Sequence, residues 1–401
     1  MRLFKKIMSA DKAYVEKMLK LHEANRRKME TVTRVKITDS KILSEFYTPG
    51  IAEPCVAISK KKEDVYKYTN KGNIVAVISD GTAVLGLGDI GPEAGLPVME
   101  GKCMLFKTFA DIDAIPIMID SKDPEEFIKT VKLISPGLGG INLEDIAAPK
   151  CFEIERRLRK ELNIPVMHDD QHGTAIVLVA GLINALKLAG KNFKDIKVIF
   201  NGAGAAGTAI TKMLLAEGCK NITIADRAGA IYRGRTDNMN SEKEELAKIT
   251  NPENLKGKLD EIIKGADVFI GVSGPGLLTK DHIKSMAEKP IIFAVANPIP
   301  EIMPADAKEA GAFIIATGRS DFPNQVNNCL AFPGVFRGAL DVHASDINDE
   351  MKMAAANCLA NWVKEPTVDC IIPSAFEEGL AFKVGEAVAQ AAIKSGVARK
   401  S

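Results

Sequence analysis

The sequence lacks several features that would assign it to common classes of protein. Its seven cysteines form no Cys-x-x-Cys pair, which argues against a thiolate zinc site and a disulfide framework. The formal net charge of +1 comes without a basic block, so neither nucleic acid nor a membrane surface is an expected partner. No apolar run approaches the ~20 residues needed to cross a bilayer. The N-terminus also lacks the apolar core of a secretory signal, so a cytoplasmic protein is expected.

The length and the order of the expected elements indicate an α/β protein. A chain of 401 residues with 46% hydrophobic content can build two domains, each with its own core. We predict an N-terminal α/β domain for substrate and metal over residues 1–164. A Rossmann-like, doubly wound dinucleotide-binding domain is predicted over residues 165–401, with C-terminal helices that pack back onto its sheet.

A glycine motif in the second half has the context of a dinucleotide-binding turn. It follows an expected strand at 196–200 and precedes an expected helix at 208–217. Asp226 ends the next strand at close to the ~20-residue spacing of an acid that binds the adenosine ribose. This acid favours NAD, but Arg227, Arg233 and Arg235 could receive the extra phosphate of NADP, so the choice stays open. The predicted cofactor-binding residues are Gly202, Ala203, Gly204, Ala205, Ala206, Gly207 and Asp226.

An earlier motif, Gly-Leu-Gly-Asp-Ile-Gly at 86–91, matches the same fingerprint by letter. We interpret it differently. The preceding residues are typical of a hairpin, with strands at 73–79 and 82–88 closed by an Asp-Gly turn. Pro92 follows, and no amphipathic helix is expected to open there. The segment is therefore predicted to be a loop that lets a ligand approach the backbone.

Two pairs of acids follow consecutive expected strands. Glu144 and Asp145 precede an expected crossover helix at 151–162, and Asp169 and Asp170 follow the strand that begins at Ile164. In a right-handed βαβ unit these strand ends lie on the same rim, so the carboxylates converge. Oxygen ligands without a Cys or His cluster indicate Mg²⁺ or Mn²⁺. As neighbours at a strand end, Asp169 and Asp170 are expected to point to opposite sides. The alternative is two independent helix caps.

Single residues elsewhere allow two interpretations each. Lys102 stands between apolar segments and could act as a base, or it could reach solvent from a helix end. Tyr47 precedes a rigid Thr-Pro-Gly turn, where a tyrosine is more often a packing residue. Asn297, Asn327 and Asn328 could hold a carboxylate or the nicotinamide amide, or they could simply form turns.

Together these motifs resemble the malic enzymes, and specifically their short form, over nearly the whole chain. The matching segments are Tyr-Thr-Pro-Gly-Ile-Ala at 47–52, Leu-Gly-Leu-Gly-Asp-Ile-Gly at 85–91, Leu-Pro-Val-Met-Glu-Gly-Lys at 96–102, Asn-Leu-Glu-Asp at 142–145, His-Asp-Asp-Gln-His-Gly-Thr-Ala at 168–175, the glycine motif at 202–207, Ala-Asn-Pro at 296–298 and Asn-Asn-Cys-Leu-Ala-Phe-Pro-Gly-Val at 327–335.

The resemblance implies an enzyme that converts malate to pyruvate and CO₂ and reduces NAD or NADP with Mg²⁺ or Mn²⁺. It implies a general acid, a general base, an acid that orients the base, three metal ligands and substrate-holding amides. A base of this kind would have a pKa lowered towards ~7–8 by burial and the nearby cation. By this resemblance Tyr47 would be the general acid, Lys102 the general base and Asp169 the acid that orients the base. The metal ligands would be Glu144, Asp145 and Asp170. The substrate-holding amides would be Asn297, Asn327 and Asn328, with Asn297 also at the cofactor.

The resemblance also implies a homodimer, in which the N-terminal helices could carry Tyr47 to the partner's site. Two departures from the family pattern stand out. Ala83 occupies the position where larger malic enzymes have a substrate-gripping arginine, and the chain is too short for the further C-terminal domain of longer relatives. The alternatives are an amino-acid dehydrogenase, which would not need the convergent carboxylates, and a nucleotide-sensing module without catalysis.

Overall fold

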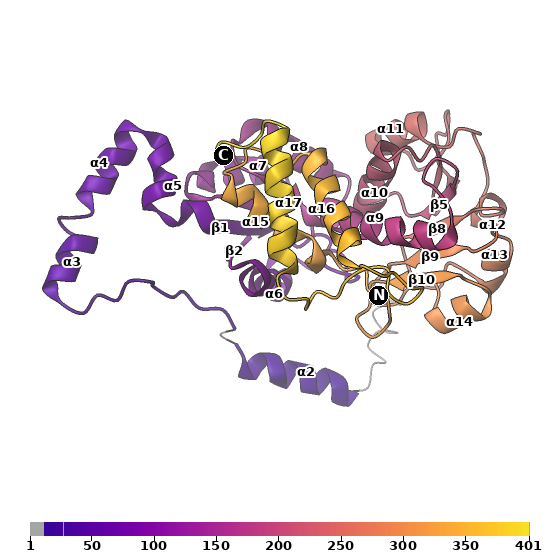
Figure 1. Cartoon of the computed structure of the whole chain (residues 1–401), viewed down its shortest axis with the longest axis horizontal. Helices are drawn as coiled ribbons and strands as arrows, with labels where there is room; N and C mark the ends of the chain where they lie inside the picture. Colours follow the sequence, from indigo (N-terminus) through magenta and orange to yellow (C-terminus); the bar gives the residue numbers. More distant parts are fainter. Residues whose placement is uncertain (1–11, 27, 401) are drawn as a thin grey trace. The chain divides into compact units, whose positions relative to one another are not determined.

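The computed structural model describes residues 12–26 and 28–400, and the chain divides into the units Met1–Gly72 and Asn73–Ser401 (Figure 1). The described part of the first unit is helical, and none of its four α-helices has a buried side chain. Tyr47 directly follows the second of them and is 61% exposed. The four helices are α2 (Lys12–Ala24), α3 (Ser40–Phe46), α4 (Ala52–Lys60) and α5 (Val65–Tyr68).

The second unit begins with a parallel sheet of four strands in the order β2-β1-β3-β4. Its strands are β1 (Ile74–Ser79), β2 (Asp113–Met118), β3 (Gly140–Leu143) and β4 (Val166–His168). The predicted hairpin is wrong, because β1 pairs in parallel with β2 and β3, and residues 82–88 form a loop. All but the first residue of β1 is buried, as expected of a central strand covered on both faces.

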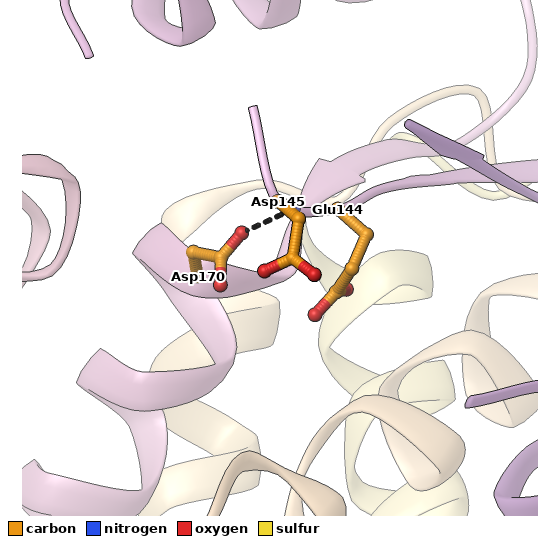
Figure 2. A group of neighbouring side chains, drawn as sticks. All are labelled: Glu144, Asp145 and Asp170. Carbon is orange, nitrogen blue, oxygen red and sulfur yellow. Dashed lines mark hydrogen bonds between the residues drawn. The ribbon is translucent and has the colours of Figure 1, made fainter. Parts of the chain in front are cut away.

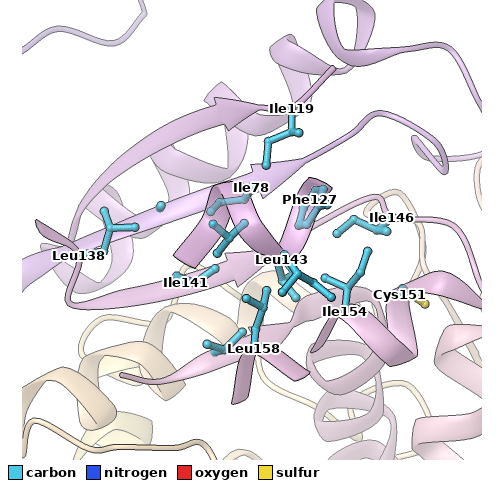
Figure 3. Close-up of a cluster of buried hydrophobic side chains, with 14 of the residues drawn as sticks. Ile78, Ile119, Phe127, Leu138, Ile141, Leu143, Ile146, Cys151, Ile154 and Leu158 are labelled. Carbon is cyan, nitrogen blue, oxygen red and sulfur yellow. The ribbon is translucent and has the colours of Figure 1, made fainter. Parts of the chain in front are cut away.

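The helices α6 (Pro92–Ala110), α7 (Pro124–Ile134) and α8 (Lys150–Glu161) accompany this sheet. Figure 3 shows the apolar cluster that α7 and α8 form with it, in which Phe127, Ile141 and Leu158 are almost fully buried. Because α6 opens directly after Gly91, the expectation that no helix follows the earlier glycine motif is wrong. The motif still differs from a dinucleotide turn, since a long loop separates it from the end of β1.

Helix α9 (Asp169–Ala189) links the two sheets and begins earlier than the expected Gly173. Asp169 and Asp170 are therefore the first residues of a helix and not neighbours on a strand, so their side chains diverge by the helical rotation. By length and composition α9 could cross a membrane, contrary to the expectation that no segment would, but 72% of its apolar window is buried. It packs against α10 (Ala205–Ala216) and α16 (Asp349–Trp362), so its apolar character is that of a core helix.

The second sheet has the order β10-β9-β8-β5-β6-β7, and only β7 runs antiparallel to its neighbour. Its strands are β5 (Lys197–Asn201), β6 (Asn221–Asp226), β7 (Gly229–Ala230), β8 (Val268–Gly271), β9 (Ile291–Ala294) and β10 (Ile314–Thr317), which confirms the predicted doubly wound sheet. Besides α10, its helices are α11 (Ser241–Ile249), α12 (Leu259–Ile262), α13 (Lys280–Lys284) and α14 (Pro304–Glu309). The predicted domain boundary between residues 164 and 165 stays a prediction, while the first sheet extends to His168.

The C-terminal helices α15 (Phe332–Asp341) and α17 (Leu380–Lys394) pack against each other and against α6, and α16 packs against α9 and α17. The expectation that the C-terminal helices would return to the second sheet is therefore wrong for α17, whose partner α6 belongs to the first sheet. Glycines let α15 and α17 approach closely. A Cβ atom added at Gly338 would lie 2.3 Å from the carbonyl oxygen of Gly385.

This close approach makes Gly338→Ala destabilising despite the better helix propensity of alanine. The backbone of α17 would have to shift, and such overpacking costs about 1–3 kcal/mol. Thermal unfolding should show a lower Tm. Gly101→Ala in α6 is the matched control, because a Cβ there meets no atom within 4 Å. It should leave the stability unchanged or raise it by at most about 1 kcal/mol. Equal Tm values for both variants would contradict the packing argument.

Candidate active site

Three carboxylates come together at the carboxyl ends of β3 and β4. Glu144 and Asp145 directly follow β3, and Asp170 lies in the first turn of α9, so that one oxygen of each lies within 4.8 Å of the others (Figure 2). One Asp170 oxygen, Oδ2, accepts a hydrogen bond of 2.8 Å from the backbone N–H of Asp145. The structure thus brings together the three residues predicted to bind the metal.

The electrostatics of this cluster fit a divalent cation. Burial, and after it the charge of Asp170, raises the pKa of Asp145 to about 7 against the opposing effect of Lys102. Burial likewise raises the pKa of Glu144 well above its ordinary value. Asp145 Oδ2 is buried and accepts no hydrogen bond from the described residues. A cation with oxygen ligands would satisfy this oxygen and relieve the repulsion.

Lys102 lies inside this cluster and is 7% exposed. Its Nζ is 2.5 Å from Asp169 Oδ2 and 2.7 Å from Glu144 Oε1, and it stands 4.4 Å from the centre of the Phe332 ring. Burial alone lowers the pKa of Lys102, but the charges of the surrounding carboxylates raise it above the ordinary value. Asp169, Glu144 and Asp170 thus raise the pKa of Lys102 in this arrangement, whereas the expected lowering towards ~7–8 included the effect of a bound cation and stays a prediction.

The close fit of Asp169 depends on a glycine one helical turn later. Asp169 is fully buried, and a Cβ atom at Gly173 would lie 1.9 Å from its Oδ1. The same Cβ would lie 3.1 Å from that of Asn328, which places this predicted substrate residue beside Asp169. In this position Asp169 pairs with Lys102, as predicted.

The loop of the earlier glycine motif connects the first sheet to residues predicted for the substrate. A Cβ atom at Gly86 would lie 2.6 Å from the carbonyl oxygen of Asn297, so this glycine permits the contact. Ala83, where the arginine of larger relatives would stand, donates its backbone N–H to the Asp145 carbonyl at 2.9 Å. In contrast, Asn327 uses its side-chain oxygen to cap the 3₁₀ helix η4 (Asn328–Leu330).

The second glycine motif forms a tight turn between β5 and α10. Gly202 directly follows β5 with a φ of +132°, and a Cβ there would lie 2.8 Å from the Val272 carbonyl oxygen. A Cβ at Gly207 would lie 2.1 Å from the Gly202 carbonyl oxygen. Both positions therefore require glycine. The turn lies where β5 has β6 on one side and β8 on the other, the switch point at which such sheets bind dinucleotides.

Asp226, predicted for the ribose, is engaged by several donors. Its Oδ1 lies 2.7 Å from Arg235, and its Oδ2 lies 2.7 Å from Lys243 and 3.0 Å from the Asn238 amide. Burial alone raises the pKa of Asp226, but hydrogen bonds from Lys243 and Arg235 outweigh it and hold the pKa low. Arg235, predicted as one receiver of a 2′-phosphate, is therefore already paired, and Lys243 was not anticipated from the sequence.

Other residues at the site were also missed. Phe332 covers Lys102 from α15, and a buried group of Glu155, His168 and Gln171 lies behind Asp170. His168 and Gln171 belong to the segment whose acids were singled out, but no charge pattern marks Glu155. A cavity of about 500 Å³ borders Glu155 and Gln171 and does not include Lys102 or the three clustered carboxylates.

Family models and curated relatives point to one family. Residues 25–159 match the model "Malic enzyme, N-terminal domain", and residues 171–393 match "Malic enzyme, NAD binding domain". The chain is 58% identical to the bifunctional malic/malolactic enzyme of Bacillus subtilis, over 96% of this chain and 94% of that protein. It is 57% identical to the NAD-dependent malic enzyme of Geobacillus stearothermophilus, over 93% of this chain and 78% of that protein.

Solved structures show the same similarity. The malic enzyme of Pyrococcus horikoshii matches with a TM-score of 0.89 and 49% identity, over 93% of this chain and 88% of that chain. The NAD-dependent malic enzyme of Thermotoga maritima matches with a TM-score of 0.90 and 50% identity, over 92% of this chain and 98% of that chain. The two matched domains, the curated relatives and the solved structures together show that this chain belongs to the malic enzyme family.

Proposed function

We propose that this protein oxidatively decarboxylates L-malate to pyruvate and CO₂, reduces NAD or NADP, and requires Mg²⁺ or Mn²⁺. The observation that carries the proposal is the position of Lys102 Nζ between Asp169 and Glu144, at the edge of the carboxylate cluster. This arrangement offers a base next to a cation site. Membership in the malic enzyme family supplies the reaction that needs both.

The proposed mechanism assigns each proton to a residue of this chain. Lys102 takes the proton of the malate C2 hydroxyl as hydride leaves for the nicotinamide, and the short contact with Asp169 gives that proton an onward path. A divalent cation held by Glu144, Asp145 and Asp170 would supply the Lewis acid that stabilises the enolate during decarboxylation. Its charge would also offset the carboxylates that raise the pKa of Lys102.

Tyr47 completes the proposal as the general acid that protonates C3 of the enol. Asn297 and Asn328 are assigned to the substrate, because the backbone of Asn297 lies at the Gly86 loop and the Cβ of Asn328 lies beside Gly173 and Asp169. We assign Asn327 only a supporting part, since its side chain caps η4. The protein is proposed to act as a homodimer, which would cover the apolar side chains that the first unit exposes.

The reaction is tested by incubating purified protein with malate, Mn²⁺ and either NAD or NADP, and by following reduced nicotinamide and pyruvate together. We expect both products in equal amounts. Exhaustive chelation should abolish the activity, and Mn²⁺ should restore it, because the clustered carboxylates need a cation to offset their repulsion. Malate oxidation that survives chelation would contradict the proposed requirement for a cation. The rates measured with NAD and with NADP also determine the cofactor preference.

Two substitutions separate the proposed proton transfers. Lys102→Ala should lower kcat for malate oxidation by about 10²–10⁴-fold, the usual contribution of a general base. Tyr47→Phe should mainly slow the enolisation of pyruvate, measured as exchange of its methyl protons with deuterated water. Phe376→Leu, a change at an exposed aromatic residue, is a control that should leave both rates unchanged. Wild-type enolisation by Tyr47→Phe would refute the assignment of Tyr47 as the acid.

Mixing these two variants tests whether Tyr47 acts in the partner's site. If it does, a mixed dimer of Lys102→Ala and Tyr47→Phe subunits contains one complete site, made from Lys102 of one subunit and Tyr47 of the other. Random reassociation would then recover about a quarter of the wild-type activity, because half of the dimers are mixed and each has one working site. If Tyr47 acts within its own subunit, the mixture shows no more activity than the mean of its two components.

A further inference from the structure

A buried group of side chains behind Asp170 is not used by the proposed mechanism. It consists of Glu155 on α8, His168 at the end of β4 and Gln171 in α9, and each is at most 5% exposed. The His168 ring lies between two polar neighbours. Its Nε2 is 3.1 Å from Asp170 Oδ2, and its Nδ1 is 3.0 Å from Gln171 Nε2.

Glu155 fixes the orientation of the Gln171 amide. Gln171 Nε2 lies 3.2 Å from Glu155 Oε2, and a carboxylate can only accept a hydrogen bond. The amide nitrogen must therefore face Glu155, since the reverse orientation would oppose two oxygens. The second hydrogen of the same NH₂ group points toward His168 Nδ1.

This arrangement determines which His168 nitrogen carries the proton. Because Gln171 Nε2 can only donate, His168 Nδ1 must accept, and the ring hydrogen stands on Nε2. Glu155 also accepts the backbone N–H of His168 through Oε1 at 3.0 Å, so it holds both the residue and its ring orientation. The Nε2–H faces Asp170 Oδ2, but the two groups are not aligned well enough to form a full hydrogen bond.

The consequence concerns the two oxygens of Asp170. Oδ2 receives the backbone N–H of Asp145 and also faces His168 Nε2. Oδ1 is the oxygen with acceptor capacity left. We propose that Glu155, Gln171 and His168 form a positioning relay that holds Asp170 through Oδ2 and so presents Oδ1 to the divalent cation. This inference rests on the cation site of the proposed function, and it adds residues that act on a ligand without touching the cation.

The relay predicts different effects for two similar replacements of His168. His168→Gln can place an amide N–H near the position of the ring Nε2, whereas the shorter side chain of His168→Asn reaches only toward Gln171. His168→Asn should weaken Mn²⁺ binding about 10–100-fold, the usual effect of losing such a supporting contact. His168→Gln should stay within about threefold of the wild type, because the donor to Asp170 is kept.

The measurement is the dissociation constant of Mn²⁺ for the cofactor-free protein, from the electron paramagnetic resonance signal of free Mn²⁺. Steady-state assays at varied Mn²⁺ should show a raised KM for the metal and a kcat that recovers at saturation. His172→Gln is the matched control, since His172 in α9 lies 3.0 Å from Glu155 Oε2 but is not part of the relay. It should bind Mn²⁺ like the wild type.

Two outcomes would overturn the relay: equal Mn²⁺ affinity of His168→Asn and the wild type, or equal losses in both His168 variants. If His168→Asn does not fold, Gln171→Met decides in its place, because it removes the donor that fixes the ring and should weaken Mn²⁺ binding by a similar factor. Asp145→Asn separates this inference from the proposed function. Loss of Mn²⁺ binding in Asp145→Asn with unchanged binding in His168→Asn overturns only the relay, whereas unchanged binding in both overturns the cation site as well.

Discussion

The active site depends on one unfavourable arrangement, the burial of several carboxylates within reach of each other. Glu144, Asp145, Asp169 and Asp170 meet where β3 and β4 end, and Lys102 is the one lysine or arginine of the described residues that is paired with them at short distance. One ammonium group cannot neutralise four acids. Three of the four carboxylates therefore lack a balancing positive charge, which together with burial explains the raised pKa of Asp145 and the affinity for a divalent cation that we assign to the site.

The surrounding fold makes this arrangement possible by close packing instead of by further charges. Gly173 lets Asp169 lie against its own helix, Gly86 lets the loop after β1 reach Asn297, and Phe332 covers Lys102 with an aromatic face. Phe332 covers the ammonium group without adding a titratable side chain. As a result, the protonation of Lys102 responds mainly to the charge of the carboxylates and of whatever binds to them.

The sequence was sufficient to predict what depends on local pattern and on chain topology. The Rossmann-like sheet, the glycine turn at 202–207 and the convergence of Glu144, Asp145 and Asp170 follow from strand order and handedness, and the structure has all of them. The predicted hairpin at 73–88 is wrong because a buried central strand and one strand of a hairpin have the same short apolar pattern. The lowered pKa of Lys102 stays a prediction, because its direction depends on both the surrounding acids and the cation with which it was predicted. Phe332 and Glu155 could not be found, since only the tertiary fold brings them to the site.

Helix α9 has a consequence for how the two halves of this protein can be recombined. Its first residues, Asp169 and Asp170, belong to the cation site, and its length packs against α10, whose N-terminus is the dinucleotide turn. The packing of α9 against α10 therefore sets the distance between the substrate and the cofactor. A chimera that exchanges cofactor domains between two relatives must inherit β4, α9 and α10 from one parent. A junction inside this segment would combine two unmatched helix surfaces, and the nicotinamide would then lie at the wrong distance from malate even with every catalytic side chain in place.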